Sequence, residues 1–428
     1  MEETIIEIPV NQESVSSKSN DNWTELNKLW SEYFNMSVYG FEHMKQPLLH
    51  LWLGAYMTKH YKIVHSGQYK TFRVHPFFVQ DSGSGKSVGS KATFFLTQKL
   101  GLNVEFLSTI TDKCVVGGIW ENSKTGEETP KYGQLQKCDI LFWDEATSLL
   151  NGGDYNNHWH IILQMATDDP GFITKGVGTS ILKYKTEVSI SFTSYPDDSI
   201  DKTILHKGLF QRMWLVFHDR KAKELFDYFE HKADLVNVDF QKRENLQLKI
   251  RDFLNEKLKD RGRTILVNHN DYKKFMQDFV VYIKERMEKD SFKDRKQKIL
   301  LSFIARNDVI INIAGQRAIM SGKKEIDYED LLYGFSCYKK HLGSVIDFLM
   351  EGELMEQNME ERRKDKVLAL LKQQPNIGMV DLRNLLIKLP RDQWDLRETT
   401  TDRFLRKMKE DGILNYTIKK HGKKELFL

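Results

Sequence analysis

The sequence has few cysteines and no long hydrophobic run, and both absences limit what the protein can be. Only three cysteines occur in 428 residues, far apart, so neither a disulfide framework nor a Cys-x-x-Cys zinc site is expected. No apolar run approaches the ~20 residues of a membrane span. The acidic N-terminus lacks the pattern of a secretory signal or a transit peptide. We therefore expect a cytoplasmic protein without membrane contact.

The composition allows a sizeable folded body. The chain has 428 residues, of which 40% are hydrophobic. At roughly 100–200 residues per domain, this length predicts two or three domains. The first residues, up to about position 20, are polar and serine-rich, and we expect them to be disordered.

Charge is distributed unevenly along the chain. The formal net charge is +4, yet residues 361–428 hold 17 basic against 10 acidic side chains, a net of +7. A basic terminal unit on a slightly acidic body is typical of a protein whose tail contacts a polyanion such as DNA. An ordinary solvated lysine-rich surface explains the charge equally well.

Short apolar runs alternate with helical patterns along most of the chain. Such alternation predicts an α/β fold in which helices flank a parallel sheet. Pro76 is awkward in the first run, because proline cannot donate to a sheet ladder. Residues 23–65 and 221–345 are predicted to be mostly helical. The expected buried strands are residues 74–79, 140–143, 188–192 and 213–217.

A glycine-rich loop follows the first apolar run, and a helical pattern follows the loop. Backbone N–H groups of such a loop wrap phosphates, and the helix N-terminus adds partial positive charge. Lys86 is expected to reach the terminal phosphates of ATP, and the Ser87 hydroxyl to ligate Mg²⁺. The predicted nucleotide-binding residues are Asp81, Ser82, Gly83, Ser84, Gly85, Lys86 and Ser87.

An acidic pair ends the second apolar run. Asp144 can hold the magnesium shell, and Glu145 can polarise the attacking water. A strand-end acidic turn is the structural alternative, but a Gly-Lys-Ser loop followed by a strand-borne Asp-Glu favours an ATPase. Thr193 ends the third run, where it could sense the terminal phosphate or serve only as a strand-cap hydroxyl.

Two arginines are candidates for the positive charge that hydrolysis needs on the transferring phosphoryl group. Arg212 stands just before the fourth apolar run and could complete a neighbouring subunit's site as an arginine finger. Arg306, on a predicted helix, is the second candidate. For an isolated arginine, a surface ion pair is the common alternative.

These landmarks together resemble the minichromosome maintenance (MCM) replicative helicases of the AAA+ superfamily, over roughly residues 36–345. The resemblance implies a hexameric ring that uses ATP and Mg²⁺ and moves 3′ to 5′ along DNA. When the comparison with the family pattern is continued along the chain, Thr193 falls on the family's sensor position, Arg212 on its arginine finger and residues 306–339 on its helical lid. The matching segments are Ser37-Val38-Tyr39-Gly40-Phe41-Glu42 with Lys45, Asp81 to Ser87, Lys124-Thr125-Gly126-Glu127 ahead of Tyr132-Gly133, and Ile173-Thr174-Lys175-Gly176.

The sequence departs from the family pattern at three places. Gln80 holds the position of the family's first loop glycine, and Met213-Trp214 replaces its Phe-Asp. No room precedes Trp23 for the family's N-terminal OB-fold and zinc domain. The sequence therefore resembles a reduced relative from a mobile element such as a plasmid, phage or genomic island.

A hairpin is predicted around Lys175, which lies next to Gly176 and Gly178. In a hexamer, the resemblance implies that Lys175 lines a central pore and grips the phosphates of single-stranded DNA. Lys183 and Lys185 would lie on the returning arm. A solvated loop lysine is the alternative for Lys175 taken by itself.

The C-terminal residues have the pattern of a winged helix. Three short apolar-periodic helices precede two short strands joined by a Lys-Lys-His-Gly-Lys-Lys turn, which is a plausible wing. The third helix, from 399 to 410, would enter the major groove of duplex DNA. A protein-interaction module is the alternative. The predicted DNA contacts are Arg403, Arg406, Lys407, Lys419, Lys420, Lys423 and Lys424.

The sequence thus predicts an AAA+ P-loop ATPase with a C-terminal winged helix, acting as a ring-shaped DNA helicase in replication. An AAA+ transcription activator is a rival, although its Gly-Ala-Phe-Thr-Gly-Ala loop is absent. A replication initiator that binds ATP and DNA without helicase activity is another. The expected divisions are a disordered tail (1–22), an ATPase core (23–295), a helical lid (296–345), a linker (346–364) and the winged helix (365–428).

Overall fold

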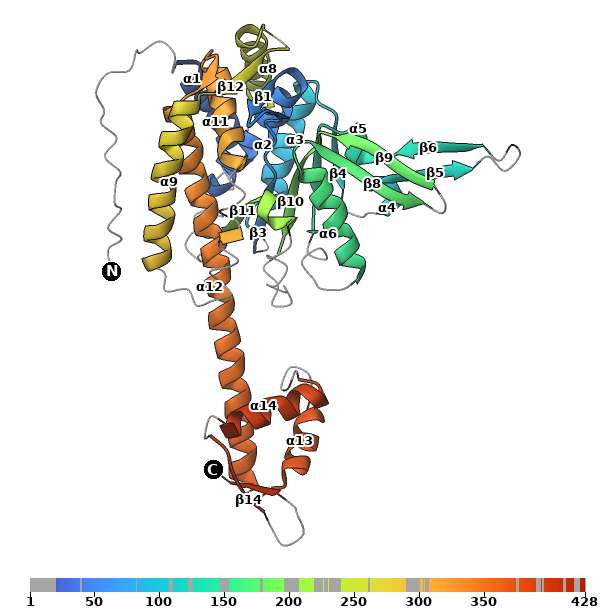
Figure 1. The fold of residues 1–428 in the computed structure, drawn as a ribbon, viewed down its shortest axis with the longest axis vertical. Helices are drawn as coiled ribbons and strands as arrows, with labels where there is room; N and C mark the ends of the chain where they lie inside the picture. Colours follow the sequence, from blue (N-terminus) through green and yellow to red (C-terminus); the bar gives the residue numbers. More distant parts are fainter. Residues whose placement is uncertain are drawn as a thin grey trace. The chain divides into compact units, whose positions relative to one another are not determined.

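The chain divides into two compact units, Met1–Asp347 and Phe348–Leu428, and each is described by itself. The computed structural model of the chain is drawn in Figure 1. It describes residues 21–38, 41–81, 83–107, 111–121, 125, 127–146, 154–177, 180–195, 208–218, 226, 230, 240–260, 262–289, 301–302, 304, 308–374, 377–389, 394, 396–410, 413–418 and 424–427.

A five-stranded sheet forms the centre of the first unit. Every neighbouring pair of its strands is parallel, so all five carboxyl ends meet at one edge of the sheet. Pro76 is the first residue of its strand, a position where its missing N–H costs no ladder bond. In spatial order the strands are β11 (Trp214–His218), β3 (Pro76–Gln80), β10 (Ser189–Ser194), β7 (Ile140–Trp143) and β4 (Val104–Leu107).

Helices pack on this sheet because its three central strands are buried on both faces. Every residue of β3, β7 and β10 is buried. Helix α2 (Glu42–His60) contacts β3, β10 and β11, while α3 (Lys86–Lys99) contacts β10 and β4 (Figure 1). The expected α/β fold, with a parallel sheet flanked by helices, is confirmed at this level.

Further helices complete the first unit. Trp159 of α6 meets Trp143 of β7 edge to face, with ring centroids 5.5 Å apart. Helix α1 packs against α8 and α3. These elements, with other helices described in the first unit, are α1 (Asp21–Ser37), α4 (Asp112–Val115), α5 (Gln134–Lys137), α6 (Asp154–Thr167), the short 3-10 helix η3 (Phe210–Arg212), α8 (Phe240–Lys257), α9 (His269–Lys289) and α11 (Asp308–Met320).

Two antiparallel hairpins stand beside the sheet. The first pairs β5 (Gly117–Glu121) with β6 (Glu128–Tyr132). The second pairs β8 (Gly171–Val177) with β9 (Ser180–Thr186), where the sequence predicts a hairpin. Strand β5 packs against β9, so the two hairpins support each other.

A second, four-stranded sheet lies partly in segments for which the sequence predicts mostly helix. Its order is β13 (Glu325–Ile326), β12 (Thr264–Val267), β1 (Lys62–His65) and β2 (Gln68–Lys70), and all of these strands except β2 fall in the segments predicted to be helical. Ser66 and Gly67, between β1 and β2, both have positive φ, as the central residues of a type I′ hairpin turn require. The helical prediction was wrong there, because each strand is too short to give a period of its own.

The second unit is built from helices and one hairpin. Helix α12 (Tyr328–Gln373) covers the segment expected to be a linker and ends inside this unit. The elements that follow are α13 (Met379–Ile387), α14 (Glu398–Glu410) and the antiparallel pair β14 (Asn415–Ile418) and β15 (Lys424–Phe427). Its core consists of Val367, Leu371, Leu382, Leu386, Trp394, Phe404, Leu405, Met408 and Leu414.

Within the described part of the chain, no helix is long and apolar enough to cross a membrane.

Candidate nucleotide-binding site

The glycine-rich loop lies at the carboxyl edge of the five-stranded sheet. Strand β3 ends at Gln80 and α3 begins at Lys86. Gly83 and Gly85 have φ of 78° and 79°, in the left-handed region that glycine adopts without strain. The Ser84 amide donates to the Asp81 carbonyl at 3.3 Å and closes the turn between them. Ser82 lies outside the described residues.

Gln80 does not disturb this turn, although it replaces a family glycine. It is an extended residue of β3, paired with His218 of β11, so its position needs no positive φ. The side chain is fully buried, and its Oε1 accepts a hydrogen bond from Ser84 Oγ at 3.0 Å. Its Nε2 has no hydrogen-bond partner among the described residues. Gln80 therefore supports the loop through its hydrogen bond with Ser84.

Gly85 is required for a second reason. A Cβ at this position would lie 2.3 Å from the Phe41 ring, which is itself buried. Phe41 immediately precedes α2. Its ring thus packs against the loop at Gly85.

Lys86 is held at the first position of α3 by backbone oxygen atoms. Its Nζ donates to the carbonyls of Gln80, Asp81 and Ser194, the last at 3.1 Å. The Tyr195 ring covers the same ammonium group, 3.7 Å from ring centroid to Nζ. Burial lowers the pKa of Lys86 to about 8, against the opposing effect of Asp81, Asp144 and Glu145.

Asp144 connects the loop to the neighbouring strands. Its Oδ2 accepts from Ser87 Oγ at 3.1 Å, and its Oδ1 accepts from Thr193 Oγ1. Thr193 Oγ1 also accepts from the Glu145 amide at 3.3 Å. Strand β10, which carries Thr193, lies between β3 and β7, so this hydroxyl sits between the two halves of the site.

Glu145 follows Asp144 in an unusual backbone conformation. Its φ is 55°, which is rare outside glycine and concentrates at functional sites. Its side chain is exposed. The Glu145 carboxylate is therefore accessible to solvent at this edge of the sheet.

The side chains present fit a magnesium nucleotide. Mg²⁺ prefers oxygen ligands and is commonly held by one or two carboxylates together with substrate phosphates. Ser87 Oγ and Asp144 Oδ2 supply a hydroxyl and a carboxylate 3.1 Å apart. Among the described residues, no group of three or more Asp, Glu, His or Cys side chains that could hold a metal ion is present.

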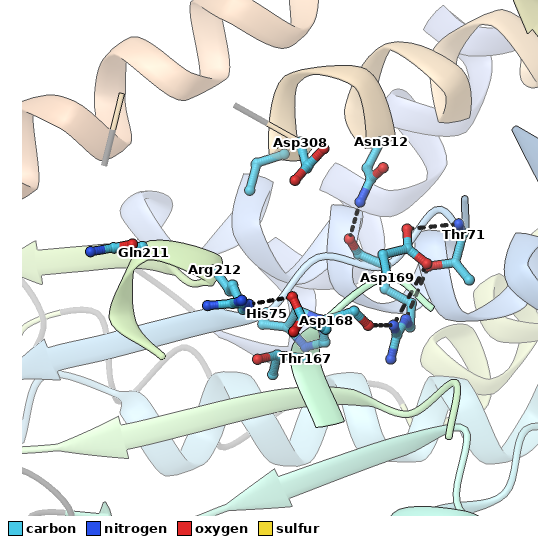
Figure 2. Close-up of a pocket in the computed structure, with 11 residues that line it drawn as sticks. Thr71, His75, Thr167, Asp168, Asp169, Gln211, Arg212, Asp308 and Asn312 are labelled. Carbon is cyan, nitrogen blue, oxygen red and sulfur yellow. Dashed lines mark hydrogen bonds and ion pairs between the residues drawn. The ribbon is translucent and has the colours of Figure 1, made fainter. Parts of the chain in front are cut away.

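Arg212 lies at the opposite edge of the sheet from Lys86. It ends η3, just before β11, and the start of β11 is paired with Pro76, the start of β3. Its Nε donates to Asp168 Oδ1 at 2.7 Å (Figure 2). Its Nη1 donates to the Gly208 carbonyl. The side chain is 7% exposed and lines a cavity of about 30 Å³. Arg212 therefore cannot serve the site of its own chain.

The hairpin lysines lie on two different faces. Lys175 points to the covered face of β8–β9 and donates to the Gly117 carbonyl at 3.1 Å. Lys183 and Lys185 lie on the exposed face. The structure thus separates the residue expected to grip DNA from the two assigned to the returning arm.

On α14 of the second unit, the amphipathic pattern expected from the sequence is confirmed. Phe404, Leu405 and Met408 are buried, whereas Arg403, Arg406 and Lys407 are exposed. Of the remaining predicted residues, Arg306, Lys419, Lys420 and Lys423 lie outside the described residues, and only the backbone of Lys424 is described, at the start of β15.

Sequence reasoning missed two groups at the site. Tyr195 stands two residues after Thr193, and nothing in the motif pattern marks an aromatic residue there. The contact between Gln80 and Ser84 was also missed, although their four-residue separation across the turn was a usable signal.

Neither protein-family models nor curated proteins match this chain. The family resemblance therefore rests on the order and spacing of its motifs.

Proposed function

We propose that this chain is an ATP-dependent DNA helicase of the MCM-like AAA+ type, working as a homo-oligomeric ring in the replication of a mobile element. The observation that carries this proposal is the gathering of Lys86, Ser87, Asp144 and Thr193 at one edge of a parallel sheet, with Glu145 exposed beside them. Phosphate-binding, metal-binding and water-activating groups are the parts that phosphoryl transfer from ATP requires.

Each residue has a distinct task in this proposal. Lys86 exchanges its carbonyl partners for the phosphates of ATP, and the N-terminus of α3 adds positive charge. Ser87 and Asp144 would hold Mg²⁺, which neutralises developing phosphate charge when it is bound. Glu145 orients and polarises the attacking water. Arg212, at the opposite edge of the sheet, could reach the site of a neighbouring subunit only after leaving Asp168.

Two features support DNA as the second partner. The β8–β9 hairpin carries three lysines, of which Lys183 and Lys185 are exposed to a strand passing beside it. The second unit presents Arg403 and Arg406 on the exposed face of α14, followed by a hairpin. We propose that this unit is a winged helix that binds duplex DNA, with α14 in the major groove.

Unwinding of forked DNA with ATP and Mg²⁺ tests the proposal. The wild type should separate the strands, whereas Glu145→Gln should bind ATP and unwind nothing. A wild type as inactive as Glu145→Gln in both unwinding and hydrolysis would favour the rival, an initiator that only binds ATP and DNA. Hydrolysis without unwinding would favour the transcription-activator alternative.

The salt dependence of duplex binding tests the second unit. For each phosphate that the protein no longer neutralises, the slope of log K against log salt should fall by about 0.9. Arg403→Gln with Arg406→Gln should therefore weaken duplex binding and flatten its slope. An unchanged slope would indicate a protein-interaction module.

A further inference from the structure

Tyr195 covers the charged group of the lysine on which the proposed phosphate-binding site depends. Its ring centroid lies 3.7 Å from Lys86 Nζ, well within the roughly 6 Å over which a cation is attracted to the face of an aromatic ring. Lys86 is 7% exposed, whereas Tyr195 is 37% exposed. The ring therefore lies on the solvent side of the ammonium group.

The hydrogen bonds of Lys86 use all of its donors. An ammonium group has three N–H donors, and Lys86 donates to the backbone carbonyls of Gln80, Asp81 and Ser194. A phosphate oxygen must come within about 2.7–2.9 Å of Nζ to accept a charge-assisted hydrogen bond. Lys86 must therefore give up some of its present contacts before it can bind a phosphate.

Two of these contacts come from consecutive residues, Ser194 and Tyr195. Strand β10 is held firmly up to this point, because Ser194 pairs with Val79 of β3 and the Thr193 hydroxyl donates to Asp144. Tyr195 follows the last residue of the strand, so its side chain can turn without breaking the pairing of β10. The Tyr195 ring is thus a cover that can move while the strand beneath it stays in place.

We propose that Tyr195 lowers the affinity of the site for ATP and ADP, because its ring holds the Lys86 ammonium group only while the site is empty. This inference rests on the proposed function for the nature of the ligand. The state that binds nucleotide is the one in which Lys86 has left the ring. The apparent Kd is then the intrinsic Kd divided by the fraction of chains in that state. Tyr195 is a positioning residue, because it acts through Lys86.

A ring that stacks on the bound nucleotide would have the opposite effect. Such a ring adds a contact in the bound state, so its removal would weaken binding. The Tyr195 ring adds its contact in the empty state, so its removal should strengthen binding. A lysine at this place in a phosphate loop reaches the terminal phosphates and not the base. A ring that covers this ammonium group therefore lies at the phosphate end of the site.

Isothermal titration calorimetry of the full chain with ADP or ATPγS, each with Mg²⁺, tests the role of the ring. Tyr195→Leu should lower the Kd for both nucleotides at least about threefold, because the cation–π contact of the empty state is lost. Tyr195→Gln, a second variant without a ring, should show the same gain. Tyr195→Phe keeps the ring and should bind like the wild type. Tyr69→Leu, which removes a 67% exposed tyrosine from β2, should also leave Kd unchanged.

The gain in affinity should depend on Lys86. In a chain that already carries Lys86→Met, Tyr195→Leu should not change the Kd for either nucleotide, because the ring has no ammonium group to hold. This double-mutant cycle isolates the pair from other effects of the ring. An equal gain in both backgrounds would overturn the inference, because the ring would then act without Lys86.

Nucleotide binding separates this inference from the proposed function. Wild-type unwinding, together with nucleotide binding by Tyr195→Leu and Tyr195→Gln that is unchanged or weaker, would overturn the inference alone. An equal gain in Tyr195→Phe would also overturn it, because the ring would then be irrelevant. If Tyr195→Leu binds both nucleotides more tightly but the wild type neither hydrolyses ATP nor unwinds DNA, the proposed function alone is overturned. Melting temperatures that match the wild type would show that the variants are folded.

Discussion

The two edges of the five-stranded sheet use polar side chains in opposite ways. At the carboxyl edge, Lys86 is held mostly by backbone carbonyls, and Glu145 is exposed, so a ligand can take over these groups. At the amino edge, Arg73 and Arg212 are buried, and each makes several hydrogen bonds. Figure 2 shows Arg212 beside Asp168. At the carboxyl edge, a ligand can replace the present partners of the polar side chains. At the amino edge, the polar side chains join separate segments of the chain.

Arg73 shows how the amino edge is held together. Its guanidinium donates to the carbonyls of Ala166 and Val188 at 3.0 and 3.1 Å, and Nε donates to Thr71 at 3.0 Å. Asp169 adds a charge partner at 3.7 Å and also accepts from the Thr71 amide at 2.8 Å. This side chain thus joins the end of α6 to the segments that enter β3 and β10.

Removing a cation from the carboxyl edge should have the largest effect, and the effect should fall on activity. Lys86→Ala removes the donor that we propose binds the phosphates of ATP, and we expect ATP turnover to fall about 10²–10³-fold. The unfolding free energy of the nucleotide-free protein should not fall, because burial already disfavours the Lys86 charge, as its lowered pKa shows. Steady-state hydrolysis and urea denaturation measure the two quantities. A clear loss of stability would show that this edge is structural too.

Removing a cation from the amino edge should instead cost stability. Arg73→Met leaves the carbonyls of Ala166 and Val188 without this donor and leaves Asp169 without its charge partner. Breaking such a buried pair costs about 3–5 kcal/mol. Arg251→Met, at an exposed arginine of α8, is the matched control and should cost less than about 0.5 kcal/mol. Equal stability of the two variants would contradict the comparison.

A fall in pH should have the next largest effect, because it should lower the stability of the amino half of the sheet. Burial lowers the pKa of both His50 and His341 to about 4. Both side chains contact β11: His341 Nδ1 accepts a hydrogen bond from the Leu215 amide at 2.8 Å, and the His50 ring stacks on Trp214. Below pH 6.5 these two histidines bind protons in the unfolded chain but not in the folded chain. The unfolding free energy therefore decreases as the pH falls from 6.5 towards 4. At pH 5 the loss is about 2 kcal/mol per histidine.

Urea denaturation at pH 7 and pH 5 measures this loss. In His341→Gln the new side chain can still accept a hydrogen bond from the Leu215 amide, but it cannot titrate. The decrease in unfolding free energy between pH 7 and pH 5 should therefore be smaller than in the wild type by the contribution of one histidine. An unchanged pH dependence in this variant would mean that His341 is protonated without harm to the fold.

The same comparison explains what could be predicted from the sequence. The carboxyl edge was predictable because its loop and its Asp144-Glu145 pair are short contiguous motifs that end apolar runs. The amino edge was not, because the partners of Arg73 come from separate segments that meet only in the fold. Arg212 was identified as a candidate finger, but its ion pair with Asp168 depends on how α6 ends beside η3.

The other differences have the same origin. Strands β1 and β12 are far apart in the sequence but pair in the fold, with Ile63 opposite Ile265. Each strand has only four residues, and the residue pattern of neither one indicates its partner. For the hairpin, the sequence predicted that Lys183 and Lys185 lie on the arm that returns from Lys175, but which face of the hairpin is covered depends on β5. Pairing between distant segments and the choice of covered face are tertiary properties.

The smallest expected effect concerns Ser84, where the carboxyl edge itself has a structural component. Its hydroxyl donates to Gln80 Oε1 at 3.0 Å and to the Asp81 carbonyl at 2.7 Å. Ser84→Ala removes both bonds and leaves the buried Gln80 amide without a hydrogen-bond partner among the described residues, so we expect a loss of about 1 kcal/mol.

Ser191→Ala is the matched control for this change, because the Ser191 hydroxyl is buried in β10 and has no hydrogen-bond partner within the described part of the chain. Urea denaturation should show the loss for Ser84→Ala alone, and KM for ATP should rise a few-fold because the loop is less well braced. If stability falls while KM is unchanged, Gln80 and Ser84 support the sheet without shaping the loop. Equal stability of the two variants would mean that the contact between Gln80 and Ser84 does not brace the loop at all.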